Sequence, residues 1–106
     1  MKKIFISQPM KGLSDEQIKK ERESIIKRIK NIIKEDFEIN NIMDKDAFLE
    51  KTPLECLAIS INKLAKSDMA YFGDGWQDAR GCSIEYICAV DYKIPIIDLE
   101  EGKIWG

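Results

Sequence analysis

Side chains that could do chemistry are concentrated in residues 73–86, GDGWQDARGCSIEY. This segment combines glycines with a tryptophan, two aspartates, an arginine, a cysteine and a glutamate. It directly follows the apolar run MAYF at residues 69–72, which has the length and composition of a buried strand. Reactive and recognition groups therefore gather where a strand is expected to end and a helix to begin.

The absence of histidine limits the chemistry that these groups can perform. The chain contains no histidine, so histidine-based triads and histidine zinc hydrolases are excluded. The three cysteines, Cys56, Cys82 and Cys88, are odd in number and have no CxxC spacing, which argues against a zinc site or a disulfide framework. Carboxylate chemistry is the leading enzymatic hypothesis, and we expect no metal and no cofactor. Cys56 and Cys88 are expected in the core.

Length, composition and charge bound the class of protein. A chain of 106 residues with 44% hydrophobic residues is expected to form one domain, residues 1–106. Its formal net charge of -2 gives no electrostatic case for a nucleic-acid partner. The apolar run at residues 4–6 is too short for a signal peptide or a membrane span. We therefore expect a cytoplasmic protein with a small-molecule partner and no membrane association.

The first half of the chain predicts a strand, a loop and a long helix. Residues 3–6 are the strand and residues 7–12 the loop. A capping box at Ser14 and Gln17 opens a helix that runs to about Lys34. Its apolar positions have helical spacing, and its charged residues, which include Arg22, are expected on a solvated face. The expected apolar positions are Ile18, Ile25, Ile29, Ile32 and Ile33.

The second half predicts further alternation of strands and helices. Residues 37–39 are a weak strand candidate, and a polar connection through Asp44 and Asp46 follows. A second capping box, TPLE at residues 52–55, opens a helix to about residue 66. Residues 69–72 and 94–97 are strands, with a helix from residue 81 or 82 between them. The two helices are expected to carry apolar residues at Leu54, Leu57, Ile61 and Leu64, and at Ile84, Ile87, Cys88 and Tyr92.

Short apolar strands that alternate with helices indicate an α/β fold with a parallel sheet covered on both faces. In such sheets ligands bind at the carboxyl ends of the strands, where the strand order reverses. The loops at residues 7–12 and 73–81 are therefore expected to lie side by side and to form the site.

Several residues of these loops also have purely structural interpretations. The glycines Gly73, Gly75 and Gly81 either make turns or allow a ligand close to the backbone. Trp76 either packs or stacks on a nucleobase. Arg80 either pairs with Asp74 or Asp78, or grips a phosphate. A minor alternative makes Cys82 a nucleophile with a lowered pKa.

The segments KIFISQPMKG and GWQDARGCSIE, with AKSDMAYF and YKIPII, resemble the nucleoside 2-deoxyribosyltransferase-like superfamily. Within it they are similar to a branch of small bacterial and phage proteins that carry a domain of unknown function of the DUF4406 type. The resemblance covers nearly the whole chain. It implies a flavodoxin-like, Rossmann-like three-layer sandwich and homo-oligomers with sites near subunit contacts, where Ile104 and Trp105 are candidates for the interface.

The resemblance also implies a reaction at an N-glycosidic bond of a nucleoside or a deoxynucleotide. The nucleophile of the superfamily is a glutamate four residues after a glycine, and Glu85 has that spacing from Gly81. A carboxylate in the first turn of a helix is favoured in its ionised form by the free amides and the macrodipole. Asp74 and Asp78 are the candidate acids. The candidate substrate-binding residues are Ser7, Gln8, Pro9, Met10, Gly12, Gly73, Trp76, Arg80, Gly81 and Cys82.

Two positions depart from the pattern of the superfamily. Phe5 stands where relatives have a tyrosine that holds the glutamate, and Ser60 stands where they have an aspartate. These departures favour a competing hypothesis, in which the chain is a non-catalytic module that senses or sequesters a nucleotide. Glu85 favours the enzyme, either a transferase or a hydrolase.

Overall fold

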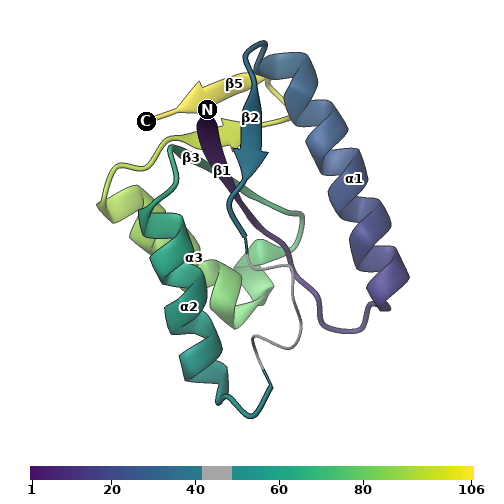
Figure 1. The fold of residues 1–106 in the computed structure, drawn as a ribbon, viewed down its shortest axis with the longest axis vertical. Coiled ribbons are helices and arrows are strands. Elements are labelled where there is room, and N and C mark those ends of the chain that lie inside the picture. The colour runs from purple at the N-terminus through teal and green to yellow at the C-terminus, as the bar shows by residue number, and fades with distance from the viewer. Residues whose placement is uncertain (42–48) are drawn as a thin grey trace.

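Five strands form one sheet with helices on both faces in the computed structural model, which describes residues 1–41 and 49–106 (Figure 1). The predicted connection through Asp44 and Asp46 lies outside the described residues. The strand order is β2-β1-β3-β4-β5, and all neighbours are parallel except β4 and β5. The elements are β1 (Lys2–Ser7), α1 (Asp15–Ile32), β2 (Phe37–Ile39), α2 (Pro53–Ala65), β3 (Met69–Phe72), α3 (Arg80–Asp91), β4 (Ile96–Asp98) and β5 (Lys103–Trp105).

The helix α1 covers one face of the sheet. Its capping box is present as predicted, because Ser14 accepts from the backbone N–H of Gln17 and the Gln17 side chain accepts from that of Ser14. Ile25 and Ile29 pack against Ile4 and Ile6 of β1 in a core cluster that also contains Tyr71 of β3. The prediction for Arg22 was wrong. This residue is 6% exposed, because it lies four residues after Ile18 and three before Ile25 on the inward face of the helix.

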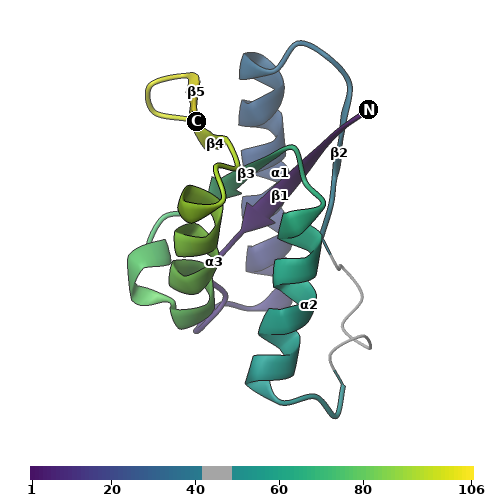
Figure 2. The same ribbon diagram turned by 90° about the vertical axis from the view of Figure 1, so that its left-hand side faces the viewer.

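The helices α2 and α3 cover the opposite face, side by side in Figure 2. There Phe5, Leu64, Ala70, Phe72 and Ala89 form a second core cluster. Successive residues of β1 thus face opposite layers, as the alternation of a strand requires.

Several predicted apolar positions of these two helices are exposed. Leu54 is 73% exposed and Tyr92 is 82% exposed, and Ile87 also faces outward. The buried positions of α3 are instead Cys82, Glu85 and Ala89, since the helix begins at Arg80 and turns this face to the sheet. Cys56 and Cys88 are half-buried, whereas Cys82 is the buried cysteine.

The architecture is the α/β flavodoxin-like, Rossmann-like sandwich that the sequence predicted. The strand order reverses between β1 and β3, so their carboxyl ends form the switch point at which such folds bind ligands. The sheet is not entirely parallel. After β4 the chain turns back at Gly102, which has a φ of 65°, and β5 pairs antiparallel with β4.

The strand β5 was not predicted. It contains Ile104 and Trp105 and gives both residues partners within the same chain. Ile104 pairs with Ile97, and the indole N–H of Trp105 donates to the Asp98 carboxylate at 3.1 Å. Their role at a subunit interface stays a prediction. No helix in the described ranges is long and apolar enough to cross a membrane.

Candidate functional site

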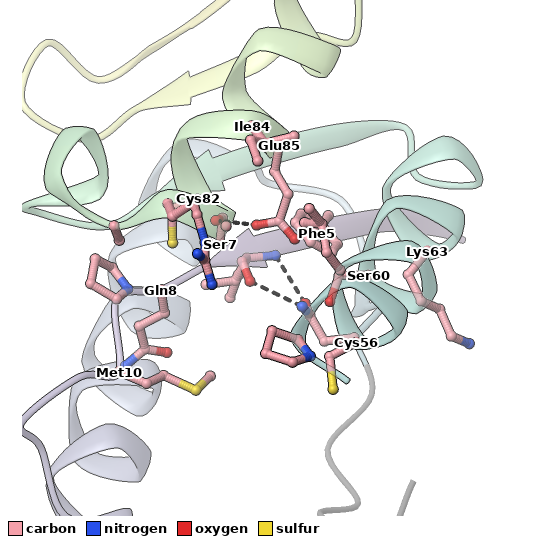
Figure 3. Close-up of a pocket in the computed structure, with 18 of the residues that line it drawn as sticks. Phe5, Ser7, Gln8, Met10, Cys56, Ser60, Lys63, Cys82, Ile84 and Glu85 are labelled. Carbon is pink, nitrogen blue, oxygen red and sulfur yellow. Dashed lines mark hydrogen bonds between the residues drawn. The ribbon is translucent and has the colours of Figure 1, made fainter. Parts of the chain in front are cut away.

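A cavity of about 860 Å³ lies beyond the carboxyl end of β1, between α2 and the beginning of α3 (Figure 3). Its volume is in the range of small-molecule sites. The described lining residues come from the first loop and β1, from α1, from the segment after β2, and from α2 and α3. They are Phe5, Ile6, Ser7, Gln8, Pro9, Met10, Arg22, Asn41, Thr52, Pro53, Leu54, Cys56, Leu57, Ser60, Lys63, Ala79, Arg80, Gly81, Cys82, Ile84 and Glu85.

Among the described lining residues of this cavity, Glu85 carries the one carboxylate, and a hydroxyl group holds it in place. The Ser7 hydroxyl donates a hydrogen bond of 2.7 Å to Glu85 Oε1, as Figure 3 shows. Both residues are buried, Ser7 at 2% and Glu85 at 6% exposure. Because Ser7 ends β1 and Glu85 lies on α3, this bond connects the sheet to the helix layer at the switch point.

Glu85 was expected in the first turn of its helix, where the ionised form is favoured, and this prediction was wrong. Because α3 begins at Arg80, Glu85 is its sixth residue and lies in the second turn, beyond the free N–H groups of the first. Burial raises the pKa of Glu85, and the hydrogen bond from Ser7 lowers it by less. The carboxylate is thus harder to ionise than an ordinary glutamate, because its charged form loses hydration.

The hydroxyl that holds Glu85 belongs to Ser7 and not to residue 5. Phe5 lines the cavity and is 2% exposed, without a hydroxyl to offer. Ser7 lies two residues further along β1 and therefore points to the same face of the sheet. Ser60, the other departure, also lines the cavity from α2. Both departures thus concern positions at the site.

The thiol alternative is contradicted. Burial is the largest influence on Cys82 and raises the pKa of its thiol. A hydrogen bond with Ser7 lowers this pKa by less than burial raises it, and the negative charge of Glu85 raises it further. Since the thiolate is the nucleophilic form, a raised pKa makes Cys82 a poor nucleophile at neutral pH. Cys82 remains a lining residue of the cavity.

The two predicted loops do lie side by side. The N–H of Gly73 donates to the Ser7 carbonyl at 2.8 Å, and a Cβ at Gly73 would contact Pro9 Cδ at 3.4 Å. Gly75 has a φ of 83° and open space where a Cβ would stand, which supports its interpretation as a turn residue. Gly12 has the same φ and is not among the described lining residues.

Arg22 and Gln8 form a buried polar network at the α1 side of the cavity. Arg22 Nε donates to Gln8 Oε1 at 3.1 Å, and Gln8 Nε2 donates to the Ile18 carbonyl at 3.0 Å. Burial lowers the pKa of Arg22. Sequence reasoning missed Arg22, although its spacing from Ile18 and Ile25 within the apolar stripe was the signal that could have found it.

A side-chain amide supports the end of β1 on its other flank. β2 ends at Ile39, so within residues 1–41 and 49–106 the next residues of β1 have no strand partner on that side. The Asn41 side chain takes this place, since its Oδ1 accepts from the N–H of Ile6 at 2.9 Å and its Nδ2 donates to the Ile6 carbonyl at 3.0 Å. Asn41 thereby fixes the strand end that carries Ser7.

The remaining predicted site residues do not share one cavity. Met10 and Arg80 line the cavity, as does Lys63, which the sequence did not indicate. Asp74 and Trp76 instead line a second cavity of about 430 Å³. Asp78 is exposed on a short 3-10 helix and is not a described lining residue of either cavity.

Trp76 packs within the chain. Its ring stacks on that of Tyr86 with a centroid distance of 3.9 Å, and Phe72 approaches both rings edge-on. This arrangement supports the packing interpretation of Trp76. Within the described part of the chain, no ion pair joins Arg80 to Asp74 or Asp78.

Comparison with known proteins gives one match. No curated protein and no solved structure matches the chain. Residues 2–98, which include both predicted loops, Ser7 and Glu85, match the family described as Domain of unknown function (DUF4406). The match covers most of the chain, and the protein therefore belongs to this family.

Proposed function

We propose that the protein cleaves or transfers the N-glycosidic bond of a nucleoside or a deoxynucleotide, with Glu85 as the nucleophile. The observation that carries this proposal is the hydrogen bond of 2.7 Å from Ser7 to Glu85, which holds a buried carboxylate at a cavity on the switch point of the sheet. The spacing of Gly81 and Glu85 and the resemblance to the nucleoside 2-deoxyribosyltransferase-like superfamily support it further.

In the proposed reaction, an oxygen of the ionised Glu85 carboxylate attacks C1′ of the sugar. The bond from C1′ to the base breaks, and the base leaves with the electron pair and takes up a proton. Water or a second base then attacks C1′ and releases Glu85, as in retaining glycosidases. Because Oε1 accepts from Ser7, Oε2 is the oxygen that we assign to the attack.

The charges of the cavity favour a nucleotide over a nucleoside. Its described lining contains the cationic side chains of Arg22, Lys63 and Arg80, against the single carboxylate of Glu85. Arginine and lysine bind phosphate through charge-assisted hydrogen bonds. Phe5 and Leu57 add apolar walls, against which a base or sugar would be desolvated.

We assign Asp78, as a proposal, the role of the acid that donates a proton to the leaving base. Asp74 lines the second cavity. Asp78 is a described lining residue of neither cavity, but it directly precedes Ala79, which lines the Glu85 cavity. If Asp78 is the acid, Asp78→Asn lowers base release without weakening substrate binding. Equal base release by Asp78→Asn and the unchanged protein would exclude this role.

A non-catalytic nucleotide-binding module is the alternative. It is favoured by one observation, that Glu85 is the single carboxylate among the described lining residues, with Phe5 and Ser60 at the positions where relatives carry a tyrosine and an aspartate. Such a module would bind nucleotides without turnover.

The test is base release, measured by chromatography, from ribonucleosides, deoxyribonucleosides and their 5′-monophosphates, with and without an added free base. Release that is lost in Glu85→Ala supports the enzyme, and dependence on the added base identifies a transferase. Thermal stabilisation by nucleotides without base release supports the binding module. If no nucleoside or nucleotide is turned over or bound, both proposals fail.

A further inference from the structure

The second cavity, of about 430 Å³, lies beyond the carboxyl ends of β3 and β4. It shares no described lining residue with the Glu85 cavity. The chain contains two tryptophans, and both Trp76 and Trp105 line this second cavity. It is therefore a separate place on the molecule, and the proposed reaction does not use it.

The hydroxyl of Tyr71 is an unpaired polar group in this cavity. Tyr71 lies in β3, is 8% exposed and lines the cavity. Its hydroxyl makes no hydrogen bond within the described part of the chain. No polar side-chain atom in that part is both buried and unpaired, so the phenol oxygen reaches the open space of the cavity. The hydroxyl of this nearly buried side chain is thus available to a ligand as a hydrogen-bond donor and acceptor.

The described lining of this cavity carries three carboxylates, Asp74, Asp98 and Glu100, and one cationic side chain, Arg28. Burial is the largest cause that raises the pKa of Tyr71, and the Asp74 carboxylate is the next. Glu21 and Glu100 raise it further, and only Arg28 lowers it. Asp74 and Glu100 line the cavity and form no ion pair within the described ranges. Carboxylates that are already solvated and unpaired are available to a cation.

The ring of Trp105, a lining residue of this cavity, contacts an ammonium group of the chain itself. The Lys103 Nζ lies over the Trp105 ring at 4.0 Å from its centroid, which is the geometry of a cation–π interaction. Both carboxylate oxygens of Asp98 already have hydrogen-bond partners, because they accept from the Trp105 indole N–H and from the Glu101 N–H. The ligand must therefore use Asp74, Glu100 and Tyr71.

We propose that this cavity binds a small organic cation, an alkyl amine whose ammonium group donates to the Tyr71 hydroxyl oxygen and to the Asp74 carboxylate. An alkyl diamine places its second ammonium group near Glu100. The alkyl chain packs on the tryptophan rings. This site is independent of the proposed function at Glu85.

The experiment titrates the full chain with putrescine at constant ionic strength. Because both tryptophans line the cavity, tryptophan fluorescence reports on this site, and calorimetry gives the affinity independently. We expect saturable binding, and we expect the uncharged diol of the same chain length not to bind. Tyr71→Phe and Asp74→Asn each weaken putrescine binding about tenfold, because each removes one hydrogen bond to a charged group.

The matched control is Glu85→Gln, which changes the other cavity and should bind putrescine as well as the unchanged protein does. No saturable binding, equal binding of the diol, or unchanged affinity in both Tyr71→Phe and Asp74→Asn would overturn the proposal. Loss of binding in Glu85→Gln would overturn it too, by assigning the diamine to the Glu85 cavity. Asp74 is exposed, so Asp74→Asn remains informative even if Tyr71→Phe unfolds the protein. Base release is measured separately, so failure of one proposal leaves the other standing.

Discussion

Ser7 and Glu85 are 78 positions apart in the sequence, and their side chains share a hydrogen bond of 2.7 Å in the buried end of a cavity. The serine is fixed by the sheet and the glutamate by a helix, so the geometry of the carboxylate depends on both layers.

Ser7→Ala removes the donor to Glu85. We expect the free energy of unfolding to fall by about 1–3 kcal/mol near neutral pH, because a buried carboxylate loses a charge-assisted hydrogen bond. The pKa of Glu85 should rise further, since the Ser7 hydrogen bond lowers it. Urea denaturation at neutral pH measures the first effect, and urea denaturation across a series of pH values measures the second. Ser83→Ala, on the same helix, is the control, and an equal effect there would contradict the prediction.

Glu85→Gln changes how stability depends on pH. The folded pKa of Glu85 is raised above its unfolded value, so between the two values the folded state binds more protons and stability falls as pH rises. This contribution is fully present below the unfolded pKa and is lost as pH rises through the folded pKa. Relative to the unchanged protein, Glu85→Gln should therefore gain stability as pH rises through this window. A difference in melting temperature between the two proteins that stays the same at all pH values would refute this.

Gln8→Ala tests the polar network at α1. The substitution removes the acceptor of Arg22 Nε and the donor to the Ile18 carbonyl. We expect a loss of about 1–3 kcal/mol in unfolding free energy, because buried polar groups lose a partner. Lys19→Ala, an exposed change on the same helix, should alter stability by less than about 0.5 kcal/mol. If denaturation midpoints shift equally for both variants, the network does not stabilise the fold.

Ser14→Ala removes the N-cap of α1. Its hydroxyl accepts from the Gln17 N–H at 3.2 Å, and such caps contribute about 1 kcal/mol. Thermal unfolding should show a lower midpoint for this variant. Ser24→Ala, exposed in the middle of the same helix, should leave the midpoint unchanged or raise it, because alanine is the better helix former.

The sequence predicted the layers of the fold because local signals specified them. Both capping boxes are present, at Ser14 and at Thr52, and the apolar run at residues 69–72 is β3. These features depend on neighbours in the chain and can be inferred from spacing alone. The meeting of the two loops followed from the general topology of α/β sheets.

Other features depended on tertiary contacts that no local pattern reveals. The inward orientation of Arg22 and the antiparallel β5 are two of them. Glu85 was predicted to be readily ionised, whereas burial raises its pKa, and the degree of burial became visible only once α3 was placed on the sheet. The separation of Asp74 and Trp76 from the Glu85 cavity likewise required the path of the chain after Gly73.

The amide of Asn41 has a consequence for the behaviour of the sheet in solution. A strand that extends past its neighbour exposes N–H and C=O groups to which a strand of another molecule can add, which is a route to edge-to-edge aggregation. The Asn41 side chain forms hydrogen bonds with both the N–H and the carbonyl of Ile6, and the N–H of Asn40 donates to the Ile4 carbonyl. The part of β1 that reaches beyond β2 is therefore closed to strand addition, while the cavity beside it remains open to a small molecule.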